Sequence, residues 1–169
     1  MAEFNKNMLS PLGFSFHVKK LPEFNHFCQS VTMPGATLGY TERPTPFKTV
    51  PVYGDHLTYG ELTAEFKVNE DLGNYIQIYD WLKGIGFPDE FKQFKDISTD
   101  EKKLAGDGIE SDAYIMVLSS NMQPVIRIDI EDMFPVSLSD LRWDSRDSSV
   151  EYIEATVTFK FLKYSFTNI

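Results

Sequence analysis

Residues Val31–Val68 read VTMPGATLGYTERPTPFKTVPVYGDHLTYGELTAEFKV, and this stretch decides how the chain is organised. An apolar segment ends at Met33-Pro34-Gly35, and a proline- and glycine-punctuated excursion then precedes a strand that alternates from Leu57 to Val68. A compact domain rarely keeps so long an irregular excursion unless it folds onto a ligand or another subunit. Since these residues form no reactive constellation, the sequence predicts an assembly arm at 34–56.

Length and composition indicate one globular domain rich in strands. The chain has 169 residues, enough to bury a substantial core, with 14 phenylalanines and 8 tyrosines among alternating Val, Ile and Thr. The net charge of −9 argues against a sequence-independent grip on nucleic acid, which requires clustered Lys and Arg. The one cysteine, Cys28 in FNHFCQSV, is expected to be a buried small hydrophobe.

The N-terminal segment MAEFNKNML has no basic start followed by an apolar run, so no signal peptide is expected. No apolar segment approaches the length that spans a membrane. These two features predict a protein that is made and kept in the cytosol.

The N-terminal strands alternate between apolar and polar residues. Phe14–Val18 predicts a half-buried strand, and Phe24–Thr32 is expected to return beside it as a hairpin after the turn at 21–25. In the strand predicted at Leu57–Val68, apolar residues at even positions from Leu62 share one face and polar residues at odd positions share the other.

The segment NEDLGNYIQIYDWLKGIGFP (69–88) changes to helical spacing. Its apolar positions are Leu72, Tyr75, Ile76, Tyr79 and Leu82, widened by Ile78, Trp81 and Ile85. We predict one helix that starts near Asn69 or Asp71, ends at Lys83-Gly84 and holds Tyr75, Tyr79 and Leu82 in the core.

The remaining chain is predicted to be strands around one charged insertion. Residues 89–112 are polar and predict a flexible insertion. Strands are expected at Ala113–Leu118 and Val125–Ile130, a turn at Met133-Phe134-Pro135, and a long final strand at Val150–Tyr164. The predicted fold class is mainly β (α+β): an antiparallel β-sandwich or split barrel with one flanking helix.

Candidate chemistry is sparse. The histidines His17, His26 and His56 are scattered and lack metal-ligand spacing, and Gly54-Asp55-His56 has no activated serine beside it. The acidic pairs Glu70-Asp71, Glu131-Asp132 and Asp144/Asp147 lie at element ends, where carboxylates usually cap backbone amides. We therefore expect no enzyme, no metal and no cofactor.

Three features together resemble a known family. They are an LP turn before an apolar strand ending in MPG, a GD turn and alternating strand before the helix NYIQIYDWL, and the late segment MFPVSLSDLRWDSRDSSVEYIEATVTFKF. This arrangement, from about Gly13 to Phe166, resembles the tail tube proteins of contractile-tailed bacteriophages, including T4-like members. The type VI secretion tube protein and baseplate tube initiators share that fold.

The resemblance implies a non-enzymatic virion protein. Its subunits would form hexameric rings that stack into the tail tube, with sheets joined across subunits, and DNA would pass through the lumen without specific binding. Expected partners are further copies, and a sheath with baseplate or terminator proteins, but no membrane. The protein would be in the host cytoplasm during assembly and then in the virion tail.

The resemblance also assigns roles to two sets of residues. The arm that would reach the adjacent ring includes Thr41, Arg43, Pro44, Pro46, Phe47, Val50 and Pro51. The faces that would line an acidic lumen carry Glu61, Thr63, Glu65 and Lys67 on one strand and Glu154, Thr156, Thr158 and Lys160 on the last. Two alternatives stay open: a tube initiator or tail completion protein of the same fold, and a small-ligand-binding β-barrel module.

Overall fold

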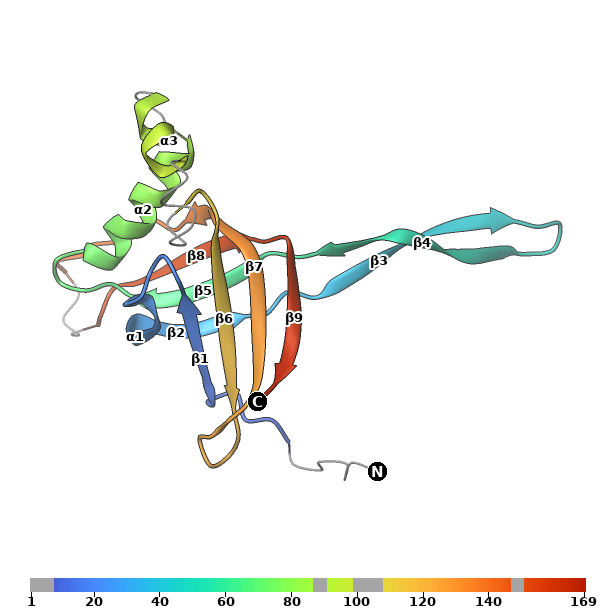
Figure 1. Ribbon diagram of the computed structural model, residues 1–169, viewed down its shortest axis with the longest axis horizontal. Helices are drawn as coiled ribbons and strands as arrows, with labels where there is room; N and C mark the ends of the chain where they lie inside the picture. Colours follow the sequence, from blue (N-terminus) through green and yellow to red (C-terminus); the bar gives the residue numbers. More distant parts are fainter. Residues whose placement is uncertain (1–7, 87–90, 99–107, 147–150) are drawn as a thin grey trace.

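The computed structural model describes residues 8–86, 91–98, 108–146 and 151–169 (Figure 1). The helices and strands, in chain order, are β1 (Phe14–Val18), α1 (Phe24–Phe27), β2 (Cys28–Thr32), β3 (Ala36–Pro44), β4 (Thr49–Tyr59), β5 (Leu62–Lys67), α2 (Gly73–Gly86), α3 (Phe91–Ser98), β6 (Ser111–Leu118), β7 (Pro124–Leu138), β8 (Glu154–Lys160) and β9 (Lys163–Asn168). Every described strand pair is antiparallel. The mainly β fold class with one substantial helix is confirmed.

The main sheet has seven strands in the order β1-β6-β7-β8-β5-β2, and β9 also pairs with β7. Strand β7 takes part in two layers. Its residues 126–131 lie between β6 and β9, whereas Phe134–Leu138 pair with β8. We call the layer of β1, β6, residues 124–131 and β9 sheet A, and the layer of β2, β5, β8 and Phe134–Leu138 sheet B.

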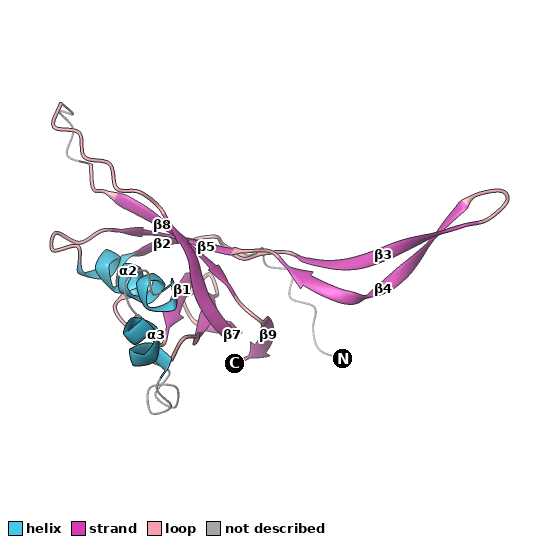
Figure 2. Ribbon diagram, turned by 90° about the horizontal axis from the view of Figure 1, so that it is seen from above, coloured by secondary structure: helices cyan, strands magenta, loops and turns pink. Residues whose placement is uncertain are grey.

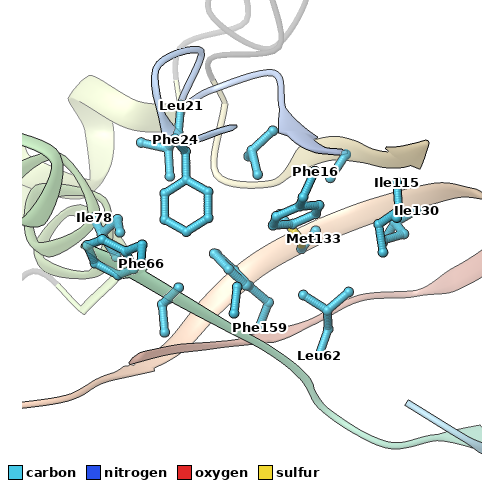
Figure 3. Packing of buried hydrophobic residues seen from close by; sticks show 14 of the residues in the cluster. Phe16, Leu21, Phe24, Leu62, Phe66, Ile78, Ile115, Ile130, Met133 and Phe159 are labelled. Carbon is cyan, nitrogen blue, oxygen red and sulfur yellow. The ribbon is translucent and has the colours of Figure 1, made fainter. Parts of the chain in front are cut away.

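A core of aliphatic and aromatic side chains fills the space between the two layers (Figure 3). Phe16 of β1 contacts Phe24 edge-on at a centroid distance of 5.9 Å and Phe159 of β8 at 6.5 Å. Phe24 in turn lies 5.0 Å from Phe66 of β5. Alternate residues of β5 and β8 enter this core, as the period of two requires, so the sequence pattern of one packed and one wet face is confirmed for these strands.

The first predicted hairpin is wrong. Strand β1 pairs with β6 and β2 pairs with β5, so the two lie at opposite ends of the sheet path. The one-turn helix α1 redirects the chain between them, because Leu21 and Phe24 are both buried and draw this segment into the core. Local alternation predicts a strand but does not indicate which strand it pairs with.

The predicted assembly arm is a regular β-hairpin rather than an irregular excursion. Strands β3 and β4 form a separate two-stranded sheet that projects far from the domain (Figure 2). The strand predicted to begin at Leu57 is interrupted at Gly60, whose amide donates to the carbonyl of Gly35 (3.2 Å). A Cβ at Gly60 would approach Pro34 Cβ to 3.2 Å, so the chain crosses itself closely where the hairpin leaves sheet B.

Two further strand boundaries differ from the prediction. Met133-Phe134-Pro135 is not a turn, because β7 continues through it with a bend at Asp132, where φ is 53°. The predicted final strand starts only at Glu154 and is divided into β8 and β9 around Phe161-Leu162. Both bends lie where β7 and its partner pass from sheet B into sheet A, which a linear pattern of alternation does not reveal.

The buried face of helix α2 agrees with the predicted one only in part, since Tyr75 and Leu82 are partly buried against the core but Tyr79 is not. Its buried residues are Asn74, Ile78, Trp81 and Gly84, whereas Tyr79 is 52% exposed and Leu82 is half-buried. Trp81 donates from Nε1 to the carbonyl of Ile109 (2.8 Å). The expectation of Tyr79 as a core residue is therefore wrong. Half-buried Tyr75 does face the domain, since its hydroxyl donates to the carbonyl of Ser139 (2.9 Å).

The helix also continues past the predicted stop at Lys83-Gly84 to Gly86. Gly84 does not cap α2; it lies within the helix, where α2 packs against α3. A Cβ at Gly84 would lie 1.7 Å from Cδ1 of Ile97, so the absence of a side chain at Gly84 leaves room for this residue of α3. Helix α3 occupies part of the predicted insertion at 89–112, and the rest of that prediction falls mostly on residues 89–90 and 99–107, outside the described residues.

Candidate functional site

Both sets of predicted lumen-facing residues lie on one face of sheet B. Strands β5 and β8 are neighbours, and their register places Thr63 opposite Thr158, Glu65 opposite Thr156 and Lys67 opposite Glu154. The buried residues of β5 and β8 alternate with these and face the core. Thr63, Lys67, Thr156, Thr158 and Lys160 are half-exposed, and Glu61, Glu65 and Glu154 are exposed.

Charges of both signs are paired across this polar face. Lys160 Nζ lies 3.2 Å from Glu61 Oε1, and Lys67 faces Glu154 across the strand pair. The face therefore carries three glutamates and two lysines, and Glu65 is the one glutamate of the three without a lysine directly opposite it. Glu65 instead accepts a hydrogen bond from Ser30 Oγ (2.8 Å). The predicted lumen-facing residues thus carry a small excess of negative charge, with paired charges set among hydroxyl groups.

Further residues of this face were missed in the sequence. Strand register places Ser30 beside Glu65, Thr32 beside Thr63 and Ser137 beside Thr158. All three are polar, as the wet face requires, but their assignment depends on which strands pair. The local sequence gave one indication of this face, the polar residues Ser30 and Thr32 at alternate positions of CQSVT.

Sheet B has two open edges. Within the described residues β2 pairs only with β5, and Phe134–Leu138 pair only with β8. The outward backbone amides and carbonyls of both segments are therefore available to a further strand. An unpaired edge of this kind is a template for strand addition unless it is covered.

The hairpin β3–β4 presents one apolar face. Leu38 is opposite Leu57 and Tyr40 opposite Tyr53, with a bulge between the two pairs. We call these four residues the apolar hairpin face; their exposed fractions range from 50% for Leu38 to 84% for Tyr53. None of the four was among the predicted arm residues, although the even-numbered alternation of Leu38 and Tyr40 could have revealed them.

The predicted arm residues lie further out along the same hairpin. Thr41 and Arg43 face the other side, opposite Val52 and Val50, while Pro44 and Pro51 lie at strand positions on the side of Tyr40. Pro46 and Phe47 are in the connecting loop, where Phe47 is 98% exposed. The structure thus brings the predicted arm residues together on one projecting element.

A second apolar surface lies at the free end of sheet A. A groove of about 380 Å³ is lined there by Met8, Leu9, Ser10, Val117, Leu118, Ser119, Ser120, Val125, Ile126, Ile128 and Phe166. No charged side chain is among its lining residues. Ile126 and Ile128 belong to the row that enters the core further along β7, so this sheet-end groove is the uncovered continuation of the core face.

The residues weighed for catalysis are dispersed. Asp55 Oδ1 lies 2.6 Å from His56 Nδ1, but both side chains are almost fully exposed on the hairpin. His17 stacks on Tyr114 at 4.8 Å, on the outer face of sheet A. Among the residues that the structure describes, no three His, Cys, Asp or Glu side chains cluster in a way that could hold a metal.

The carboxylate of Asp144 serves local structure. It accepts hydrogen bonds from the Arg146 side chain and backbone amide (both 3.1 Å), which hold the pKa of Asp144 below its ordinary value. Its predicted companion Asp147 lies outside the described residues. Cys28 is half-buried, and burial raises the pKa of its thiol to about 12, so this thiol is not activated as a nucleophile. None of the described helices is long and apolar enough to span a membrane.

The fold is similar to that of chains in solved structures of contractile assemblies. A chain in the cryo-EM structure of the anti-feeding prophage tube-terminating cap matches over 100% of both chains, with 13% identity and a TM-score of 0.64. A chain in the sixfold-symmetrised anti-feeding prophage baseplate matches over 97% of both, with 14% identity and a TM-score of 0.63. A chain in the extended sheath–tube complex of the extracellular contractile injection system PVC matches over 97% of this chain and 94% of its own, with 14% identity and a TM-score of 0.62.

No family model and no curated protein matches the chain. At such low identity the likeness concerns the fold alone. It nevertheless extends over nearly the whole chain, with the hairpin and the terminal strands included. The tube fold expected from the sequence is thus supported at the level of architecture.

Proposed function

We propose that this chain is a structural subunit of a phage-tail-like contractile assembly, forming hexameric rings that stack into a tube. The observation that carries the proposal is sheet B, a four-stranded sheet with two open edges, one packed face and one polar face. The chains that share its fold come from a tube-terminating cap, a baseplate and a sheath–tube complex. In the tail of a phage, such a tube would conduct DNA during ejection.

Ring closure would use the two edges of sheet B. Joining β2 of one copy to Phe134–Leu138 of the next removes both open edges at once and makes the sheet continuous around the ring. The core face then points outward beneath α2, and the polar face lines the bore. The sixfold symmetry of the matched baseplate is consistent with six copies in each ring.

The bore would be coated with hydroxyl groups and paired charges. Its threonines and serines hydrogen-bond water, and the pairing of Lys160 with Glu61 removes two charges that could hold a cargo. With one glutamate in excess on each subunit, a ring carries a mild negative bias. That bias would keep a phosphate backbone from adhering while DNA passes.

The projecting hairpin and the outer surface would serve contacts with other rings and proteins. The predicted arm residues, from Thr41 to Pro51, would contact the adjacent ring. A sheath and baseplate or terminator proteins are the further partners. The same fold suits a tube initiator or a completion protein, and the polymer formed by the purified chain distinguishes them: long tubes for a tube body, single rings for an initiator or cap.

A ligand-binding barrel is the less favoured alternative. The space between the sheets is occupied by Phe16, Phe24, Phe66 and Phe159, which pack ring against ring where a barrel would hold its ligand. Native mass spectrometry over a concentration series, with negative-stain microscopy, tests the proposal. Hexamers, rings or tubes are expected, and a monomer at every concentration would refute it.

A further inference from the structure

The apolar hairpin face has no cover within the described chain. Strands β3 and β4 pack mainly on each other, and Tyr40 and Tyr53 are 71% and 84% exposed. A lone two-stranded hairpin is marginally stable in water. Four large apolar side chains on one side of such a hairpin therefore require a second surface.

The sheet-end groove is likewise an apolar surface that the described chain leaves uncovered. Phe166 is 66% exposed at its rim, while Val117 and Ile126 are half-buried at its floor. Because its lining is uncharged, an apolar occupant would enter it without leaving a buried charge unpaired. The hairpin cannot dock in the sheet-end groove of its own chain, because it projects away from the end of sheet A (Figure 1).

A row of aromatic rings makes the two surfaces continuous. Tyr59, at the base of the hairpin, lies 4.9 Å from Tyr164 of β9 between ring centroids. Tyr164 lies 5.5 Å from Phe166, which lines the groove. One apolar stripe thus runs from the hairpin through Tyr59 and Tyr164 to the groove, so a contact that covers the groove can continue along the base of the hairpin.

We propose that the sheet-end groove receives the apolar hairpin face of a second copy of this chain. Each copy carries one such donor and one such acceptor, on different parts of its surface, so every copy can use both. A contact between unlike surfaces extends from copy to copy without closing on a dimer. With nine residues in β3, the hairpin is roughly 30 Å long and can cross from one ring to the next.

This inference rests on the proposed function and names the acceptor of its axial contact. It can be tested by charge substitutions with matched neighbours. Tyr40→Glu and Phe166→Glu each place a carboxylate in the contact, and should raise the protein concentration needed for ring stacking about tenfold or more. Thr37→Glu and Ser165→Glu change exposed residues of the same strands that lie on the opposite side from Tyr40 and Phe166, and should stay within about twofold of the parent.

Crosslinking identifies the acceptor directly. Tyr53→Cys protein and Phe166→Cys protein, each in a Cys28→Ser background, are mixed and treated with a short bis-maleimide. A heterodimer between the two chains is expected, and Val52→Cys in place of Tyr53→Cys should give far less, since Val52 faces the other side. Circular dichroism of each variant confirms that it is folded.

The outcomes separate the two proposals. If Tyr40→Glu prevents stacking while Phe166→Glu stacks normally and no heterodimer forms, the groove is not the acceptor and this inference is overturned, although the ring remains. If the parent forms no rings at all, the proposed function fails, yet a heterodimer specific to Tyr53 and Phe166 would still support the hairpin contact.

Discussion

The face that α2 turns to the core can be tested with two adjacent substitutions. Ile78 is fully buried and contributes to the core cluster, whereas Tyr79 is 52% exposed. Ile78→Ala removes three carbon groups from the core, which costs about 2.4 kcal/mol in transfer free energy at roughly 0.8 kcal/mol for each group. The cavity that remains brings the expected loss to about 3–4 kcal/mol in the free energy of unfolding.

Tyr79→Ala should cost less than about 1 kcal/mol in an unassembled chain, since it removes a side chain that is largely in water. Urea denaturation followed by tryptophan fluorescence is a suitable assay, because Trp81 lies in the same helix and is buried. With a slope of about 1–3 kcal/mol per molar urea, Ile78→Ala should lower the midpoint by roughly 1–4 M.

The measurement should be made at a protein concentration below that of ring formation, and repeated above it. A loss for Tyr79→Ala only in the assembled protein would show that this outer face contacts a partner. Equal losses for the two variants in the monomer, or a larger loss for Tyr79→Ala, would refute the helix orientation described above.

Four other perturbations have defined outcomes. Deletion of Thr41–Thr49 should leave the circular dichroism spectrum and melting of the domain nearly unchanged but abolish stacking, and unfolding or normal polymerisation would count against an inter-ring arm. Replacing Glu61, Glu65 and Glu154 by lysine should leave tubes intact but make them retain DNA, with a retention that weakens as salt rises; salt-independent release as in the parent would remove these residues from the bore. Gly84→Ala should destabilise the chain by about 1–3 kcal/mol, because Ile97 must move aside, and hydrogen exchange should quicken in 91–98. The thiol of Cys28, whose pKa burial raises to about 12 in the fold, should react slowly with iodoacetamide at pH 8–9 in native protein and quickly in urea, where its pKa returns to about 9.0. Because the pKa is higher in the folded state, stability should fall as pH rises from about 9 toward 12.

The elements predicted well are those whose evidence is local. Strand β1, the apolar rows of β5 and β8, and the existence of α2 follow from periods of two or 3.6 residues that the chain displays directly. The polar rows of β5 and β8 were each identified from alternation alone. Their union into one surface depends on a long-range register, which the resemblance suggested and the sequence pattern did not.

The predictions that were wrong depend on tertiary packing. Tyr79 has helical spacing as good as that of Ile78 and Trp81, and only the packing of α2 against the domain decides that its side stays exposed. In the sequence Gly84 has the pattern of a helix C-terminus, and only the tertiary contact with Ile97 shows that it is a packing glycine. The bend of β7 at Asp132 likewise has no marker in the sequence comparable to a glycine, because the positive φ there is carried by an aspartate.

The geometry of sheet B makes a ring easier to close than a sheet with an odd number of strands would. Its four strands, β2, β5, β8 and Phe134–Leu138, alternate in direction, so the two edges run opposite to each other. A rotation that carries one copy onto the next keeps every strand direction along the axis. It therefore sets β2 of one copy antiparallel to Phe134–Leu138 of its neighbour, the better-paired arrangement of backbone hydrogen bonds.

The lateral and axial contacts would then rely on different chemistry. Ring closure would use backbone amides and carbonyls along two edges, which surface side-chain substitutions hardly disturb. Stacking would use the apolar side chains of β3, β4 and the end of sheet A. Since the two sets of residues do not overlap, substitutions at Tyr40 or Phe166 should yield free rings rather than monomers, and this separation is the physical basis on which the two assembly steps can be studied independently.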